Sequence, residues 1–110
     1  MRITDLLDQK GMELHGKASS KAEAIDQLVA LMDRTGKISD VAAYRRGVLA
    51  REEEGTTGIG EGVAIPHAKT DAVREPGLSV MVVPEGVDFD SLDGQPAYLL
   101  FLIAAPDTED

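Results

Sequence analysis

Two segments in the second half of the sequence, 78–83 and 98–104, are apolar at almost every position. A strand in a sheet with one solvated face alternates apolar and polar residues, whereas a strand covered on both faces is apolar throughout. We therefore expect both segments to be strands covered on both faces. The chain has 110 residues, which suits one domain with a substantial core, and we treat 1–110 as a single domain.

The first half has helical periodicity. The segment 12–15 alternates apolar and polar residues, which favours a short strand before the helical region. Ser20 is a typical N-cap, and Glu23 three residues later completes the pattern of a capping box. One apolar stripe then predicts an amphipathic helix that ends near Gly36; its members are Ile25, Leu28, Val29 and Met32.

A second helix is predicted from Asp40, as N-cap, to about Gly55. Its buried positions are expected to be Val41, Tyr44 and Val48. Three acidic residues, 52–54, fall in its last turn, where negative charge opposes the helix dipole. This mismatch leaves two interpretations open: the helix end has a functional use, or the carboxylates are simply solvated.

Composition excludes several classes of protein. The chain contains no cysteine, which removes disulfides, thiolate nucleophiles and cysteine–zinc sites. It has no apolar run of the ~18 residues that cross a bilayer and no signal-peptide pattern, so we expect a cytoplasmic protein. The net charge of −9 argues against nucleic acid as a partner. Residues 1–60 carry −1 and residues 61–110 carry −8, which favours a basic protein partner or a solvated acidic surface.

The glycine-rich stretch 58–62 matches neither the Walker pattern nor the dinucleotide-binding pattern. A Walker loop needs Lys and Ser or Thr after its last glycine, but Val63 and Ala64 follow Gly62. The segment 88–94 superficially resembles a calcium loop, yet Leu92 occupies a ligand position. These mismatches disfavour a nucleotide-binding loop and a calcium site in these two segments.

His67 is the strongest candidate for a catalytic residue. It follows Pro66 at the end of the apolar run 63–66, so we expect it at the end of a strand, on a turn. Histidine can act as a covalent nucleophile, and phosphoryl transfer requires mainly positioning and charge neutralisation. Arginine, hydroxyl groups and glycine backbone supply suitable donors upstream. Arg51 is predicted to be catalytic together with His67, and the residues predicted to bind a phosphoryl group are Thr56, Thr57, Gly58 and Gly60.

The continuous segment 51–69, REEEGTTGIGEGVAIPHAK, resembles the active-site segment of the fructose/mannitol-type IIA components of the bacterial phosphoenolpyruvate-dependent sugar phosphotransferase system. The nitrogen-regulatory IIA proteins share this segment. The helix predicted from Ser20 and the strand near 99–105 also resemble the family. The resemblance implies a three-layer α/β/α sandwich around a mixed β-sheet. Its C-terminal helices would be missing here, because family members continue beyond the region of Pro106.

The resemblance also implies a mechanism. A IIA protein accepts a phosphoryl group from the phosphocarrier HPr on Nε2 of one histidine, here His67, and passes it to a IIB domain. Arg51 corresponds to the arginine that helps to hold the group. The resemblance implies no metal and no organic cofactor. The family's second active-site histidine has no counterpart, and we interpret His15 as a surface residue. A link to the membrane would be indirect, through a IIC permease, and an uncovered sheet face would favour a homodimer.

Three functions remain open at this point. The first is a phosphoryl carrier in sugar uptake. The second is a nitrogen-regulatory IIA whose phosphorylation state controls protein partners, and the third is a non-catalytic binding module. The residues do not identify the sugar.

Overall fold

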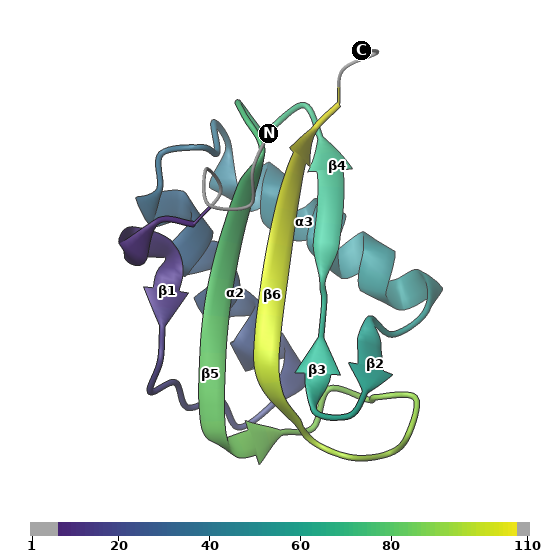
Figure 1. The fold of residues 1–110 in the computed structure, drawn as a ribbon. Coiled ribbons are helices and arrows are strands. Elements are labelled where there is room, and N and C mark those ends of the chain that lie inside the picture. The colour runs from purple at the N-terminus through teal and green to yellow at the C-terminus, as the bar shows by residue number, and fades with distance from the viewer. Residues whose placement is uncertain (1–6, 108–110) are drawn as a thin grey trace.

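The structure, a computed structural model, describes residues 7–107 (Figure 1). None of the helices in this part of the chain has both the length and the apolar character needed to cross a membrane. In chain order the elements are η1 (Gln9–Gly11), β1 (Met12–Glu13), α2 (Lys21–Arg34), α3 (Val41–Glu54), β2 (Gly58–Gly60), β3 (Val63–Ala64), β4 (His67–Thr70), β5 (Gly77–Val87) and β6 (Ala97–Pro106).

The strands form one mixed sheet with β6 near its centre. The order is β1-β5-β6-β3-β2, and β4 also pairs with β6, beyond β3 along the same edge (Figure 1). β5 and β6 are antiparallel, whereas β3 and β4 both run parallel to β6. The two apolar segments of the sequence are thus the long central strands, as predicted.

Both helices lie on the same face of the sheet, behind it in Figure 1. The hydroxyl of Ser79 on β5 is fully buried and donates to the carbonyl of Leu28 on α2 at 3.0 Å, which fixes α2 over β5. The predicted mixed α/β architecture is confirmed. On the opposite face, Phe101 is partly exposed and Ile103 is 39% exposed. The expectation that 98–104 is covered on both faces is therefore wrong, because within residues 7–107 both helices pack on one face only. The described residues make two layers, and the third layer of the sandwich stays a prediction.

The helix starts follow the local sequence closely. The Ser20 hydroxyl accepts from the backbone N–H of Glu23 at 3.2 Å, and Asp40 accepts from that of Ala43 at 3.1 Å. The apolar stripe of α2 is buried, and so are Tyr44 and Val48 of α3. Val41 was expected in the core and is 40% exposed, because the first residue of α3 points to solvent. The early strand is also shorter than the predicted 12–15, since it ends at Glu13.

The surroundings of His67 differ from the sequence-based expectation. Only the first half of the apolar run, Val63–Ala64, forms β3, and His67 begins β4 instead of standing on a turn after a strand. Pro66 lacks an N–H, but its carbonyl accepts from the N–H of Ile103 on β6 at 3.1 Å. That bond keeps the chain beside β6 through the proline. His67 therefore sits in a hydrogen-bonded strand, paired with Ile103.

Candidate active site

The last turns of α3 face β4 across an open cleft of about 300 Å³. Its lining residues come from these two elements alone: Gly47, Ala50, Arg51 and Glu54 from α3, and His67, Ala68 and Lys69 from β4. The structure thus brings together Arg51 and His67, the two residues that the sequence analysis predicted to be catalytic.

Gly47 allows the two elements to approach each other closely. A Cβ atom at this position would lie 3.3 Å from Cγ2 of Thr70 and 3.5 Å from Cβ of Ala68, both on β4. Any larger side chain would have to displace these neighbours. The glycine therefore sets how near the Arg51 side of α3 comes to His67.

The His67 ring is held in one tautomer. The side chain is half-buried, and its Nδ1 lies 3.0 Å from the carbonyl oxygen of Ile65. A carbonyl can only accept a hydrogen bond, so the proton of a neutral ring must be on Nδ1. Nε2 then carries the free electron pair. The backbone two residues upstream therefore both orients the ring and leaves Nε2 as the nitrogen with an available electron pair.

Arg51 is oriented by the turn that follows α3. Its Nη1 donates to the carbonyl of Gly55 at 2.9 Å. Within residues 7–107 the guanidinium makes no other hydrogen bond. A guanidinium has five N–H donors in a fixed plane. The side chain is therefore anchored at one corner while donors remain for an anion in the cleft.

Lys69 and Glu54 are two charged residues of the cleft that the sequence analysis did not name as site residues. Lys69 follows His67 by two residues on β4, and residues at that spacing share one side of a strand. The two-residue spacing from His67 is the sequence feature from which the position of Lys69 could have been predicted. Glu54 could not be placed in this way, because its position depends on how α3 packs against β4. The cleft combines two cationic side chains with one carboxylate, a balance suited to a small anion.

The segment 56–60 does not line this cleft. Thr56 donates from its hydroxyl to the carbonyl of Phe89 at 2.9 Å and accepts from the N–H of Gly58 at 3.0 Å. The hydroxyl of Thr57 donates to Glu52. Gly60 adopts a positive φ of 103°. These groups build the turn in this structure, and direct phosphoryl binding by Thr56, Thr57, Gly58 and Gly60 stays a prediction.

The two interpretations of the acidic helix end apply to different residues. The Glu52 side chain is only 6% exposed and forms an ion pair with Lys21, with Nζ and Oε1 2.8 Å apart. Glu53 and Glu54 are exposed. One carboxylate is therefore used inside the fold. His15, expected at the surface, is indeed exposed.

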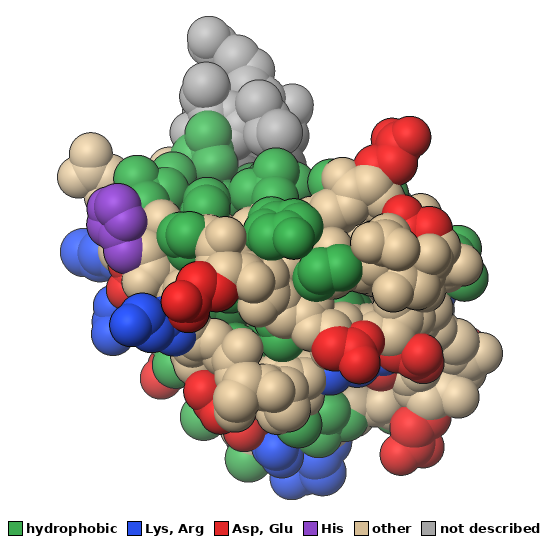
Figure 2. Space-filling view, turned by 90° about the horizontal axis from the view of Figure 1, so that it is seen from below, with side chains coloured by type: hydrophobic (Ala, Val, Ile, Leu, Met, Phe, Trp, Pro, Cys, Tyr) green, Lys and Arg blue, Asp and Glu red, His purple; other side chains and the backbone are tan. Residues whose placement is uncertain are grey.

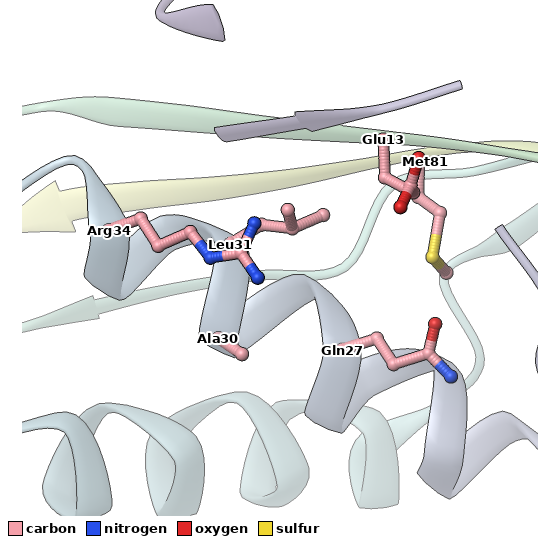
Figure 3. Close-up of a pocket in the computed structure, with 6 residues that line it drawn as sticks. All are labelled: Glu13, Gln27, Ala30, Leu31, Arg34 and Met81. Atoms are coloured by element: carbon pink, nitrogen blue, oxygen red, sulfur yellow. The ribbon is translucent and has the colours of Figure 1, made fainter. Parts of the chain in front are cut away.

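Other surface features lack the chemistry of the cleft. A smaller pocket of about 140 Å³ lies between β1, α2 and β5, and it presents no nucleophile (Figure 3). Its lining residues are Glu13, Gln27, Ala30, Leu31, Arg34 and Met81. Across residues 7–107, no three His, Cys, Asp or Glu side chains group together as metal ligands would. In the view of Figure 2, from below the molecule, most of the charged side chains on the right-hand side are acidic.

Comparison with known proteins agrees with this geometry. Residues 5–110 match the family model described as "Phosphoenolpyruvate-dependent sugar phosphotransferase system, EIIA 2". The fructose-specific EIIABC component of Bacillus subtilis is 47% identical over 105 residues, which are 96% of this chain and 16% of that protein. This chain therefore spans only a small part of that relative.

Two solved structures are also similar. The nitrogen regulatory protein IIA-Ntr of Neisseria meningitidis has a TM-score of 0.87 at 30% identity, covering 97% of this chain and 73% of that one. A complex of enzyme IIAMTL and phosphorylated enzyme IIBMTL from Escherichia coli has a TM-score of 0.76 at 32% identity, covering 94% and 72%. The chain belongs to the EIIA type-2 family of the phosphoenolpyruvate-dependent sugar phosphotransferase system.

Proposed function

We propose that the chain is a phosphoryl carrier in sugar uptake, in which Nε2 of His67 accepts a phosphoryl group from HPr and passes it to a IIB domain. The observation that carries this proposal is the bond from Nδ1 of His67 to the carbonyl of Ile65 at 3.0 Å. It leaves the electron pair of Nε2 available for attack. A transferase role agrees with the family of the chain.

The proposed step balances as a simple exchange of bonds. The Nε2 electron pair forms a new bond to phosphorus, and the bond between phosphorus and the donor breaks with its electron pair returning to the donor. The proton on Nδ1 stays on the ring, directed at Ile65. Transfer to the acceptor repeats the exchange in the opposite sense at His67.

Arg51 and Lys69 supply the electrostatic part of the proposal. Both line the cleft with His67, one from each side. Phosphoryl transfer depends chiefly on positioning and on neutralising charge on the phosphoryl oxygens. The fork of Arg51 suits two such oxygens, whereas Lys69 acts as a point charge.

The partners belong to the same proposal. The similarity to a IIA chain complexed with phosphorylated IIB supports a IIB acceptor. Glu61, Asp71 and Glu75 are exposed, as docking on a positively charged HPr surface requires. If they dock HPr, neutralising all three raises the KM for phospho-HPr at low salt. A single 1–110 domain, a cytoplasmic location, an indirect link to the membrane through IIC, and a homodimer are further parts of the proposal.

The test is phosphorylation of the purified chain with phosphoenolpyruvate, enzyme I and HPr. We expect one acid-labile phosphoryl group per chain by intact mass, lost in His67→Ala and retained in the matched control His15→Ala. NMR of the phosphorylated ring should place the group on Nε2. A folded chain that takes up no phosphate, or a His67→Ala variant that still does, would overturn the proposal and favour a binding module.

A regulatory role is a second candidate, favoured by the similarity to IIA-Ntr. Both roles use the same phosphorylated histidine, so the experiment above does not separate them. Addition of a IIB domain and its sugar does. Sugar-dependent loss of the phosphoryl group supports transport, whereas a group that persists supports regulation.

A further inference from the structure

Glu52 is the most deeply buried of the charged side chains that form ion pairs within residues 7–107. It is 6% exposed and bonds to Lys21 of α2, whereas the other pair, Arg45 with Asp26, is at the surface. A buried carboxylate is costly unless each of its oxygens has a partner. Both oxygens of Glu52 have partners, and these contacts indicate the structural role of the buried carboxylate.

Both oxygens of Glu52 reach the turn after α3. Oε1 accepts from the backbone N–H of Thr57 at 3.2 Å, and Oε2 accepts from the Thr57 hydroxyl. Lys21 reaches the same turn, because its Nζ lies 3.4 Å from the hydroxyl oxygen of Thr56. The same Nζ also lies 4.9 Å from the centre of the Phe89 ring. The ion pair thus binds two successive residues of the turn.

The same turn holds Arg51. The carbonyl that accepts from Arg51 belongs to Gly55, which lies between Glu52 and Thr57. Successive residues of an α-helix point about 100° apart. Arg51 can therefore line the cleft of His67 while Glu52 bonds to α2 and the turn. The backbone that Glu52 fixes is the backbone that orients the guanidinium.

We propose that Glu52, through Lys21 and Thr57, is a positioning residue that fixes the Gly55 carbonyl and thereby aims Arg51 at the phosphoryl group on His67. This inference rests on the proposed function of His67. It separates two roles within one helical turn. Arg51 contacts the transferred group, and Glu52 acts only through Arg51. Preorganised donors of this kind accelerate transfer because they need no rearrangement in the transition state.

The test is a double-mutant cycle between Glu52→Gln and Arg51→Ala, using the rate of chain phosphorylation at several phospho-HPr concentrations. With Arg51 present, Glu52→Gln should lower the limiting rate about tenfold with little change in KM. With Arg51→Ala, the same substitution should change the rate less than about twofold, because its target is gone. The exposed neighbour Glu53→Gln is the matched control, with an unchanged rate.

Two further measurements make the result decisive. The NMR signal of the Arg51 side-chain N–H should shift in Glu52→Gln and stay in place in Glu53→Gln. If Glu52→Gln does not fold, Thr57→Val replaces it in the cycle, with Thr57→Ser as the variant that keeps the hydroxyl and restores the rate. Equal loss of rate in both Arg51 backgrounds, or an unmoved Arg51 signal, would overturn the inference. Absence of phosphorylation in the parent chain would instead overturn the proposed function.

Discussion

The hydroxyl of Tyr44 donates to the carbonyl of Ile103 at 2.8 Å and ties α3 to the strand residue that pairs with His67. Burial raises the pKa of Tyr44 above its ordinary value. The folded protein thus holds the phenol proton more tightly than the unfolded chain does. This contribution to stability is complete below the unfolded pKa of about 10 and is lost as the pH rises above it.

We expect Tyr44→Phe to lower the free energy of unfolding by about 1 kcal/mol at pH 7, because the hydrogen bond from the phenol to the Ile103 carbonyl is lost. The variant should also lose less stability than the parent between about pH 10 and 11. Urea unfolding at a series of pH values checks both effects. Tyr98→Phe is the control, since Tyr98 is 45% exposed. Parallel alkaline curves for parent and variant would contradict the prediction.

Asp93 should make the protein sensitive to acid. Backbone N–H groups of Glu61 and Gln95 donate to its carboxylate and hold its pKa below the ordinary value. The stability it provides is present above the unfolded pKa of about 3.9 and is lost as the pH falls through the lower, folded pKa. Asp93→Asn should therefore be less stable than the parent at pH 7, with a gap that closes below about pH 4. Urea unfolding at pH 7 and below about pH 4 measures this difference in stability. Glu85→Gln serves as the control. A difference that is the same at both pH values would refute the prediction.

Gly47 provides a test of the spacing between α3 and β4. Gly47→Ala should change stability little, because a gain of about 1 kcal/mol in helix propensity offsets the tight contact with Thr70. Gly47→Leu should destabilise by about 1–3 kcal/mol and slow phosphorylation of His67, because it pushes the helix away from the strand. Thermal unfolding and the phosphorylation assay report the two effects. Ala42→Leu, at an exposed position of α3, is the control. A Leu variant with the parent's rate would show that the spacing is unimportant.

Arg51→Lys should reduce the rate of phosphorylation about tenfold while leaving the melting temperature nearly unchanged. Lysine keeps the charge but lacks the planar fork that bonds Gly55 and that, in the proposed function, also binds the phosphoryl group. Arg46→Lys, exposed on the same helix, is the matched comparison. If the two variants transfer equally fast, charge alone explains the role of Arg51.

The features that could be predicted from the sequence are those determined locally. Ser20 and Asp40 cap their helices through residues three positions away. The two apolar segments form the predicted strands, although only the first of them is buried on both faces. The segment 51–69 carried enough family-specific pattern to predict His67 and Arg51 together, and both line one cleft.

The features that were missed depend on packing between distant segments. The bond from Lys21 to Glu52 joins two helices, so no local pattern revealed it. The continuation of the sheet through Pro66 depends on Ile103 of β6, which lies far along the chain. Val41 matched the apolar pattern of its helix, but its exposure was decided by where α3 enters the layer.

The central position of β6 has a consequence for the order of events during synthesis. β6 follows every other described strand in the chain, yet it pairs with β5, β3 and β4. A nascent chain therefore cannot complete this sheet until residues up to about 106 have left the ribosome. His67, made earlier, gains its neighbour Ile103 only at that stage. The strand pairing of the proposed nucleophile is thus completed only when the last described strand joins the sheet.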